Sequence, residues 1–200
     1  MHLGLAVAVG YLLGSIPSAY LIGRIRGFDV RRQGSGNVGA GNVGRLAGVW
    51  FGVIVLALDV GKALVVFAFV GDEPVTLVAA SWAVIVGHQY PIWLGFVGGR
   101  GEAVSLATGF VVAPLPMLAV FPVLVVGWFT KNLALGWLLA VTIMPIVAWF
   151  VAGPTETVFT IGVAVLTCLR RLIGSPGIAA ASFGQTWRDR LLYDREPGSA

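Results

Sequence analysis

Residues 46–70 read LAGVWFGVIVLALDVGKALVVFAFV, and this segment decides the fold class of the chain. It contains only two charged residues, Asp59 and Lys62, and it exceeds the roughly 20 apolar residues that a helix needs to cross a bilayer. The rest of the chain has the same character, since 58% of its 200 residues are hydrophobic and 11% are charged. Soluble domains carry about 25% charged residues, so this chain has too few charges to cover a water-facing surface. We therefore predict an all-α integral membrane protein.

Apolar stretches on both sides of this segment extend the pattern to about seven transmembrane helices, two of them short. The other stretches lie at about 3–25, 75–94, 103–113, 115–130, 133–152 and 155–172. The two short ones meet at Pro114 and Pro116, which favours a turn between two helices over one kinked helix. In the first stretch Gly10, Gly14 and Ser18 recur every four residues, which predicts close contact with another helix.

The end of the chain has a different composition. We assign residues 1–173 to a single transmembrane domain and residues 174–200 to a cytoplasmic tail. In the tail Phe183, Trp187 and Leu191 recur at a spacing of four, with arginines between them. This spacing is typical of an amphipathic helix on the inner membrane surface, and the alternative is a frayed polar tail.

The distribution of charge predicts the orientation of the chain in the membrane. Every second loop has either no charge or only acidic residues, which are Asp72, Glu73 and Glu156. The other loops and the tail carry the basic residues Arg24, Arg26, Arg31, Arg32, Arg45, Arg100, Lys131, Arg170, Arg171, Arg188, Arg190 and Arg195. Because cytoplasmic loops hold the excess of Lys and Arg, seven spans place the amino terminus outside and the carboxyl terminus inside.

Composition also excludes several kinds of site. Cys168 is the single cysteine, so the chain has no internal disulfide and no multi-cysteine metal site. His2 and His88 are the only histidines, and the nine acidic residues are scattered, so we expect neither a metal nor a cofactor. The net charge of +4 follows from the basic loops, so we do not expect nucleic acid as a partner.

Residues 34–45 read GSGNVGAGNVGR and form the most informative loop. Repeated glycines let the backbone approach a ligand closely, and successive N–H groups can form a concave anion site. An arginine at the end of the loop can add a bidentate phosphate contact. We interpret the loop as a phosphate site rather than a flexible connector, with candidate ligands Gly34, Ser35, Asn37, Gly39, Asn42 and Arg45.

A second loop on the same predicted side reads GHQYP at 87–91 and GFVGGRG at 95–101. Arg100 stands between glycines just before a helix, so Gly99 and Arg100 are further candidates for binding a phosphate. The nearby Glu102 is close enough in sequence to pair with Arg100, which would weaken an anion site. His88 is a candidate for catalysis, and a structural role is the alternative.

Asp59 and Lys62 lie one helical turn apart within the apolar segment 46–70. Charges at membrane depth are costly and are usually either paired or functional. We interpret these two residues as a structural ion pair, and a functional role is the alternative.

Four segments carry a family resemblance, namely YLLGSIP at 11–17, the glycine loop at 35–45, LDVGK at 58–62 and the second loop at 87–101. In this order they resemble the bacterial acyl-phosphate:glycerol-3-phosphate acyltransferases. The resemblance implies transfer of a fatty acyl group from acyl phosphate to the 1-hydroxyl of glycerol 3-phosphate, which gives lysophosphatidic acid and phosphate in phospholipid synthesis. It also implies a multi-pass protein of the bacterial inner membrane, with a cytoplasmic active face and with these two substrates and membrane lipid as partners.

By the same resemblance, Ser35 and His88 are the candidate catalytic residues, and Lys131 joins the residues expected to bind substrate. The chain also departs from the family pattern. The departures are Gly41, Val97, Glu102, Val104, residues 131–136 (KNLALG), which lack the family's serine, and residues 170–174 (RRLIG), which lack its His and Asn. We favour an active acyltransferase; the alternatives are a catalytically impaired lipid-binding paralogue and a small anion or phosphate transporter.

Overall fold

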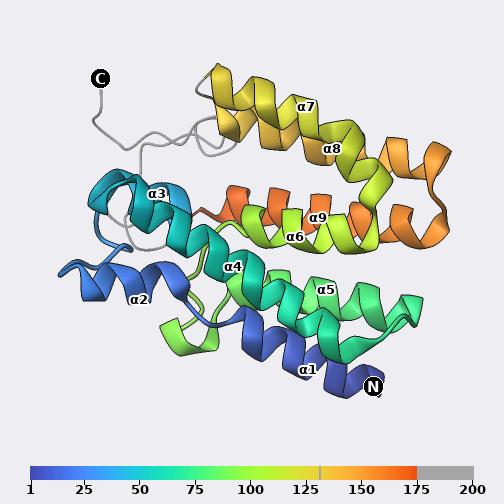
Figure 1. The fold of residues 1–200 in the computed structure, drawn as a ribbon, viewed down its shortest axis with the longest axis horizontal. Helices are drawn as coiled ribbons and strands as arrows, with labels where there is room; N and C mark the ends of the chain where they lie inside the picture. Colours follow the sequence, from blue (N-terminus) through green and yellow to red (C-terminus); the bar gives the residue numbers. More distant parts are fainter. Residues whose placement is uncertain (131, 175–200) are drawn as a thin grey trace.

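Long helices lie side by side in the computed structural model, which describes residues 1–130 and 132–174 (Figure 1). Within those residues the regular elements are all helical, with one short 3-10 turn, η1. In chain order they are α1 (Leu3–Gly14), α2 (Ser18–Ile25), α3 (Ala40–Ala47), α4 (Val49–Val70), α5 (Pro74–Gln89), η1 (Ile92–Leu94), α6 (Glu102–Val112), α7 (Pro114–Phe129), α8 (Leu133–Val151) and α9 (Pro154–Ile173).

The apolar stretches predict most of these helices, with two differences toward the amino end. Residues 40–47 form the helix α3, so the second half of the predicted glycine loop is helical, and Gly48 separates it from α4. The stretch 3–25 is not one helix, because α1 ends at Gly14 and α2 begins at Ser18. Pro17 lies in the break, and proline lacks the N–H that a continuous helix requires there. Between α6 and α7 the backbone of Ala113 leaves the helical region, with φ −137° and ψ 61°, and α7 then runs back past α6 (Figure 1). The predicted turn at Pro114 is therefore confirmed, and a single kinked helix is excluded.

Four segments are long and apolar enough to cross a membrane, and they are Leu3–Ile25, Val49–Val70, Pro74–Leu94 and Leu133–Val151. The helices α6 and α7 are apolar but shorter. The remaining long helix, α9, carries Glu156, Arg170 and Arg171. These features confirm an all-α integral membrane protein, while the number of seven spans and their orientation stay predictions.

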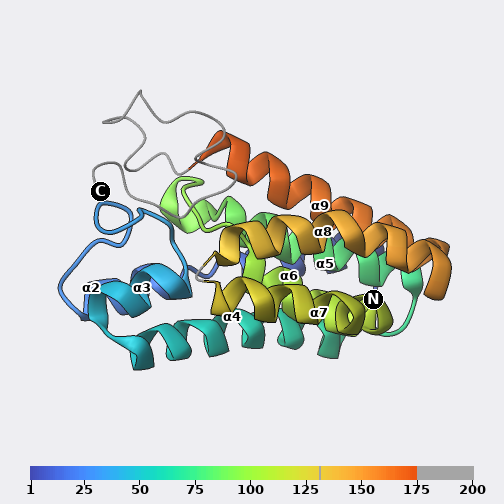
Figure 2. The ribbon, with the colours of Figure 1, turned by 90° about the horizontal axis from the view of Figure 1, so that it is seen from above.

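The loops separate into two groups at opposite ends of the molecule. The segments between α1 and α3, between α5 and α6 and between α7 and α8 lie at one end, together with the end of α9 (Figure 1 and Figure 2). The amino terminus and the α4–α5 and α8–α9 loops lie at the other end. The basic loops thus share one end, as the charge pattern predicts. Lys131 and residues 175–200 lie outside the described residues, so the amphipathic tail helix stays a prediction.

Small residues let α1 and α5 pack in close contact. A β-carbon at Gly10 would lie 2.8 Å from the carbonyl oxygen of Ala80. At Gly14 an added β-carbon would overlap the backbone of Val84, and at Gly87 it would overlap the carbonyl of Tyr11. The predicted contact through the Gly10 and Gly14 repeat is therefore confirmed, and α5 is the partner. This contact sets the position of His88, which lies next to Gly87 on the last turn of α5.

We expect the substitution Gly14→Ala to destabilise the protein by about 1–3 kcal/mol, because the new methyl group must push α5 away. Thermal unfolding of the detergent-solubilised protein, followed by size-exclusion chromatography, measures the effect. The matched control is Gly4→Ala on the same helix, where an added β-carbon meets nothing within 4 Å. Equal melting temperatures for the two variants would contradict the close α1–α5 contact.

Candidate active site

A cavity of about 360 Å³ lies at the basic end of the molecule, where the glycine loop, α4, the end of α5 and the start of α6 meet. Its polar lining comes from both predicted loops and from α4, whereas α4, α6, α7 and α8 supply apolar side chains. The lining residues are Asn37, Gly39, Ala40, Gly41, Asn42, Arg45, Leu56, Asp59, His88, Arg100, Gly101, Glu102, Ala103, Leu106, Leu124, Trp128, Leu133 and Trp137.

The buried side chain of Asn42 holds the glycine loop in shape. Its Oδ1 accepts a hydrogen bond from the Ser35 N–H at 3.0 Å, and its Nδ2 donates to the carbonyls of Val30 at 3.1 Å and Gln33 at 3.0 Å. Gly34 has φ +58°, and a β-carbon there would overlap the Asn42 amide. The glycine at 34 is therefore required both by its backbone conformation and by the close approach of Asn42.

Arg45 and Asn37 present polar groups of this loop to the cavity. The Arg45 Nη2 donates a 3.1 Å hydrogen bond to the Ser35 hydroxyl, and Arg45 lines the cavity while Ser35 does not. Ser35 thus supports the arginine from behind. The Oδ1 of Asn37 is buried and has no hydrogen-bond partner among the described residues, so it can accept a hydrogen bond from a ligand hydroxyl.

His88 belongs to a buried cluster with two charged residues of α4. The Nζ of Lys62 lies 2.9 Å from Asp59 Oδ1 and 3.0 Å from His88 Nδ1, and it donates to the carbonyl of Ile16 at 3.0 Å. The carboxylate of Asp59 also lies 3.6 Å from His88 Nδ1. The predicted Asp59–Lys62 ion pair is therefore confirmed, but it also contacts the candidate catalytic histidine.

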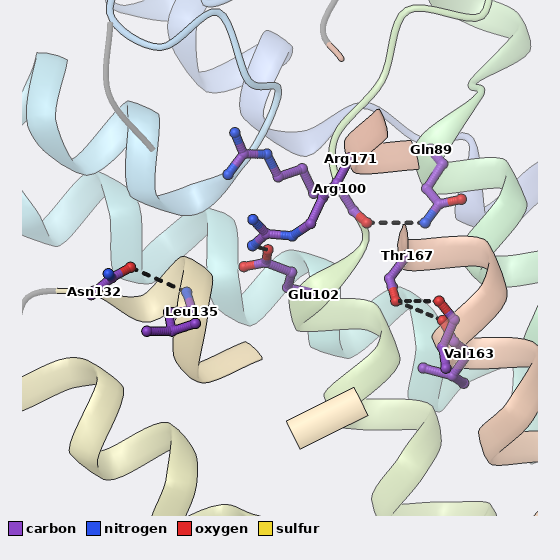
Figure 3. Close-up of polar contacts among 9 residues, drawn as sticks. Gln89, Arg100, Glu102, Asn132, Leu135, Val163, Thr167 and Arg171 are labelled. Atoms are coloured by element: carbon purple, nitrogen blue, oxygen red, sulfur yellow. Dashed lines mark hydrogen bonds and ion pairs between the residues drawn. The ribbon is translucent and has the colours of Figure 1, made fainter. Parts of the chain in front are cut away.

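The second loop is held by side chains from α5 and α9. Arg170, which is 2% exposed, donates to the carbonyl of Gly99 at 3.1 Å and to that of Gly98 at 2.7 Å. Gln89 donates from Nε2 to the carbonyl of Arg100 at 3.0 Å (Figure 3). A β-carbon at Gly99 would overlap His88 Nε2, so the loop lies directly against the imidazole.

Arg100, Arg171 and Glu102 bring three charges to the edge of the cavity (Figure 3). Arg171 donates a short hydrogen bond to the Glu102 carboxylate, so the acid that we expected beside Arg100 pairs with Arg171 of α9. Burial and the positive charge of Arg171 together lower the pKa of the Arg100 guanidinium to about 10, whereas Glu102 opposes the shift. Arg100 therefore keeps its positive charge at neutral pH.

The structure brings most of the predicted site residues to this one cavity. Asn37, Gly39, Asn42, Arg45, His88 and Arg100 line it. Gly34, Ser35 and Gly99 lie directly behind the lining, against Asn42, Arg45 and His88 respectively. Lys131 lies outside the described residues, so its role stays a prediction.

Sequence reasoning missed several residues that support the lining. It did not predict that Lys62 and Asp59 contact His88, and it assigned no role in the site to Gln89, Arg170 or Arg171. The available signal was charge at membrane depth, since a buried arginine or lysine is usually functional or paired. Within residues 1–130 and 132–174, no group of three His, Cys, Asp or Glu side chains could hold a metal ion.

The cavity combines positive charge with an apolar wall. Arg45, Arg100 and the first turn of α6, whose backbone N–H groups carry partial positive charge, surround its polar part. Leucine and tryptophan side chains from four helices, Leu56, Leu106, Leu124, Trp128, Leu133 and Trp137, form the rest. Such a site can bind an anionic group and a hydrocarbon chain side by side.

Comparison with known proteins agrees with this chemistry. The family described as glycerol-3-phosphate acyltransferase matches residues 4–173. Glycerol-3-phosphate acyltransferase 4 of Dehalococcoides mccartyi is 34% identical, and the match covers 95% of this chain and 88% of that protein. Glycerol-3-phosphate acyltransferase 2 of Moorella thermoacetica is 40% identical, with 81% of this chain and 86% of that protein covered.

Solved structures show the same relationship. The crystal structure of PlsY, an integral membrane glycerol 3-phosphate acyltransferase, in its glycerol 3-phosphate form matches with a TM-score of 0.74 and 31% sequence identity, covering 90% of this chain and 98% of that chain. The lysophosphatidic acid form matches with a TM-score of 0.73 and 32% identity, covering 84% of this chain and 87% of that chain. On the fold, the sequence and the arrangement of the cavity, this chain belongs to the glycerol-3-phosphate acyltransferase family.

Proposed function

We propose that this membrane protein transfers a fatty acyl group from acyl phosphate to the 1-hydroxyl of glycerol 3-phosphate, and that it does so in a bacterial inner membrane with the cavity facing the cytoplasm. Its family membership makes it a glycerol-3-phosphate acyltransferase of membrane phospholipid synthesis. The acyl-phosphate donor, the position of the acylated hydroxyl and the cytoplasmic active face are the proposed parts. The basic loops at one end of the molecule support the cytoplasmic assignment.

The observation that carries the proposal is the composition of the single cavity described above. Glycerol 3-phosphate is small and anionic, whereas acyl phosphate joins an anionic phosphate to a long hydrocarbon chain. Arg45 and Arg100 can hold phosphate oxygens through charged hydrogen bonds. The apolar wall, which reaches the helices that face lipid, suits the acyl chain. Holding the two reactants together supplies a large part of the rate enhancement.

The chemistry requires little from the protein beyond binding and charge stabilisation. Acyl phosphate is an activated mixed anhydride. The hydroxyl oxygen of glycerol 3-phosphate forms a bond with the acyl carbon, the bond between that carbon and the phosphate oxygen breaks, and phosphate leaves. The hydroxyl proton passes to a phosphate oxygen, so the reaction needs no covalent enzyme intermediate. Guanidinium groups and N–H donors stabilise the negative charge that develops on the oxygens.

The roles of the predicted catalytic residues follow from their contacts. Ser35 supports Arg45 through a hydrogen bond and does not line the cavity, so we assign it to positioning the arginine. His88 lines the cavity and is the better candidate for contact with the reacting atoms. The two alternative functions, an inactive lipid-binding paralogue and an anion transporter, are not favoured, because the relatives compared above are acyltransferases.

Purified protein should convert acyl phosphate and labelled glycerol 3-phosphate to labelled lysophosphatidic acid, with release of one phosphate for each acyl group transferred. Thin-layer chromatography of the lipid product and a phosphate assay measure both. Acyl-coenzyme A is the control donor, and we expect no product from it. Product from acyl-coenzyme A alone would contradict the donor assignment, and phosphate release without lysophosphatidic acid would contradict the acceptor assignment.

The substitution Arg45→Ala should lower kcat/KM for acyl transfer by about 100-fold, because it removes a charged hydrogen bond to phosphate worth about 2–3 kcal/mol. Ser35→Ala should cause a smaller loss, since the arginine remains. Arg32→Ala is the control, because Arg32 is an exposed arginine of the same loop region and lies outside the cavity lining. Similar losses for Arg32→Ala and Arg45→Ala would point to a general effect of charge.

The substitution Leu124→Trp should reduce turnover of long-chain acyl phosphates more than that of short-chain ones, because the larger ring fills the apolar part of the cavity. Competition between two acyl phosphates of different length in one reaction measures this preference. Leu118→Trp on the exposed face of the same helix serves as the control. An unchanged ratio of products in Leu124→Trp would exclude the apolar wall as the acyl site.

A further inference from the structure

The buried cluster of Lys62, Asp59 and His88 carries an inference about how the histidine acts. The ammonium group of lysine has three N–H donors and no acceptor. The Nζ of Lys62 has three acceptors within hydrogen-bond distance: Asp59 Oδ1 at 2.9 Å, His88 Nδ1 at 3.0 Å and the Ile16 carbonyl at 3.0 Å. The Ile16 carbonyl and the imidazole accept hydrogen bonds from the ammonium, and Asp59 Oδ1 forms an ion pair with it.

The balance of charge places the proton on the lysine. Lys62, Asp59 and His88 are 7%, 1% and 8% exposed, so charges in this cluster are largely removed from water. The cluster holds one carboxylate, and a second positive charge beside Lys62 would have no counter-ion of its own. The Nζ of Lys62 faces the Ile16 carbonyl and the Asp59 carboxylate, both of which can only accept, so the lysine carries the proton and the imidazole stays neutral.

Groups on the other elements around His88 point the same way. Arg170 of α9 donates to the carbonyl of Gly99, the residue against which His88 Nε2 lies, and Arg100 lines the same cavity. Asp59 is the acidic group that approaches the imidazole, at 3.6 Å, and it already pairs with Lys62. The surrounding charge is thus predominantly positive, which disfavours a protonated histidine.

A neutral imidazole whose Nδ1 accepts a hydrogen bond must carry its proton on Nε2. His88 lines the cavity, and its Nε2 forms no hydrogen bond with the part of the chain that the structure describes. The backbone of Gly99 and the carbonyl of Val38 lie close to Nε2, since a β-carbon at Gly99 would overlap both atoms. Because Nε2 has no hydrogen-bond partner among the described residues, its N–H can donate to an oxygen of a ligand in the cavity that His88 lines.

We propose that Lys62 and Asp59 fix His88 as the neutral Nε2–H tautomer, so that His88 donates a hydrogen bond to an oxygen of the reacting substrates and does not accept the proton of the glycerol hydroxyl. To act as the base, His88 would need a lone pair on Nε2 and therefore a proton on Nδ1. That proton would point at the ammonium group of Lys62. His88 is then a catalytic hydrogen-bond donor, and Lys62 and Asp59 are positioning residues. The role of His88 as a donor rests on the proposed acyl transfer, whereas the assignment of its tautomer is independent of that function.

The tautomer can be tested without any activity measurement. The chain has two histidines, so His2→Ala leaves His88 as the only imidazole. In protein labelled with ¹⁵N-histidine and held in detergent micelles, we expect a protonated Nε2 and an unprotonated Nδ1 that do not titrate between about pH 6 and 8. A proton on Nδ1, or an imidazolium signal at neutral pH, would overturn the proposal.

The substitution Lys62→Met tests the positioning role in the same spectra. Without the ammonium, Asp59 becomes the nearest partner of Nδ1 and attracts a proton to it. We expect the His88 signals and the acyl-transfer rate to depend on pH more strongly than in the wild type. A variant that keeps the wild-type tautomer and the wild-type pH profile would show that Lys62 does not hold the histidine.

Two replacements of His88 separate a donor from a base. Glutamine has an N–H group at a similar reach and cannot accept a proton at neutral pH, whereas leucine has neither property. We expect kcat for His88→Gln to stay within about tenfold of the wild type and kcat for His88→Leu to fall by about 10²–10³-fold, the usual loss for one donor to a developing oxyanion. Size-exclusion profiles and melting temperatures check that both variants are folded.

If folded His88→Gln and His88→Leu proteins were equally inactive, that result would overturn the role of His88 as a donor. If wild-type protein shows no acyl transfer but His88 has the expected tautomer, the proposed function fails while the assignment of the imidazole stands.

Discussion

Lipid offers no partner for a charge or for an unpaired backbone group, so this chain has to satisfy its buried polar groups from within. Lys62, Asp59, Arg170 and Arg171 are all 7% exposed or less. Besides the Asp59–Lys62 pair within α4, their partners lie on other elements: Lys62 reaches the Ile16 carbonyl and His88, and Arg170 reaches the carbonyls of residues 98 and 99. These bonds join α4, α5 and α9 at one end of the molecule, and the cavity lies where they meet.

Close packing of small residues makes those bonds possible. The glycines of α1 and α5 bring the two backbones together, and the break between α1 and α2 leaves the Ile16 carbonyl beside α4. A bulkier residue at Gly14 or Gly87 would move the end of α5 and His88 with it. The loop at 98–99 also requires a residue without a side chain, because a β-carbon at Gly98 would overlap the carbonyl of His88. Glycine thus determines how near the candidate catalytic groups lie, and the buried charges determine how they are oriented.

The sequence predicts the helices and the two loops of the site, because apolar length and glycine-rich composition are local properties. It also predicts the proline turn before α7, since a proline limits the backbone wherever it stands. Contacts between distant elements are different. Arg170 and Arg171 follow an apolar stretch and look like basic residues that mark the cytoplasmic side, yet one binds the second loop and the other pairs with Glu102. The pairing of Asp59 with Lys62 is visible from their spacing, whereas the approach of His88 depends on how α4 and α5 pack. No pattern in one segment contains that information.

The departures from the family pattern acquire a different meaning once their contacts are known. Taken separately, a glutamate at 102 weakens an anion site, and two arginines at 170 and 171 replace groups that the family uses. In the structure Glu102 and Arg171 form one ion pair, so the negative charge of Glu102 is balanced within the site. Of the charged lining residues, Asp59 and Glu102 are balanced by Lys62 and Arg171, which leaves the positive charges of Arg45 and Arg100 for an anion. The Glu102–Arg171 pair and the loop carbonyls bound by Arg170 hold the site in one arrangement. The proposed binding of two anionic substrates beside a neutral histidine is chemistry that needs such order.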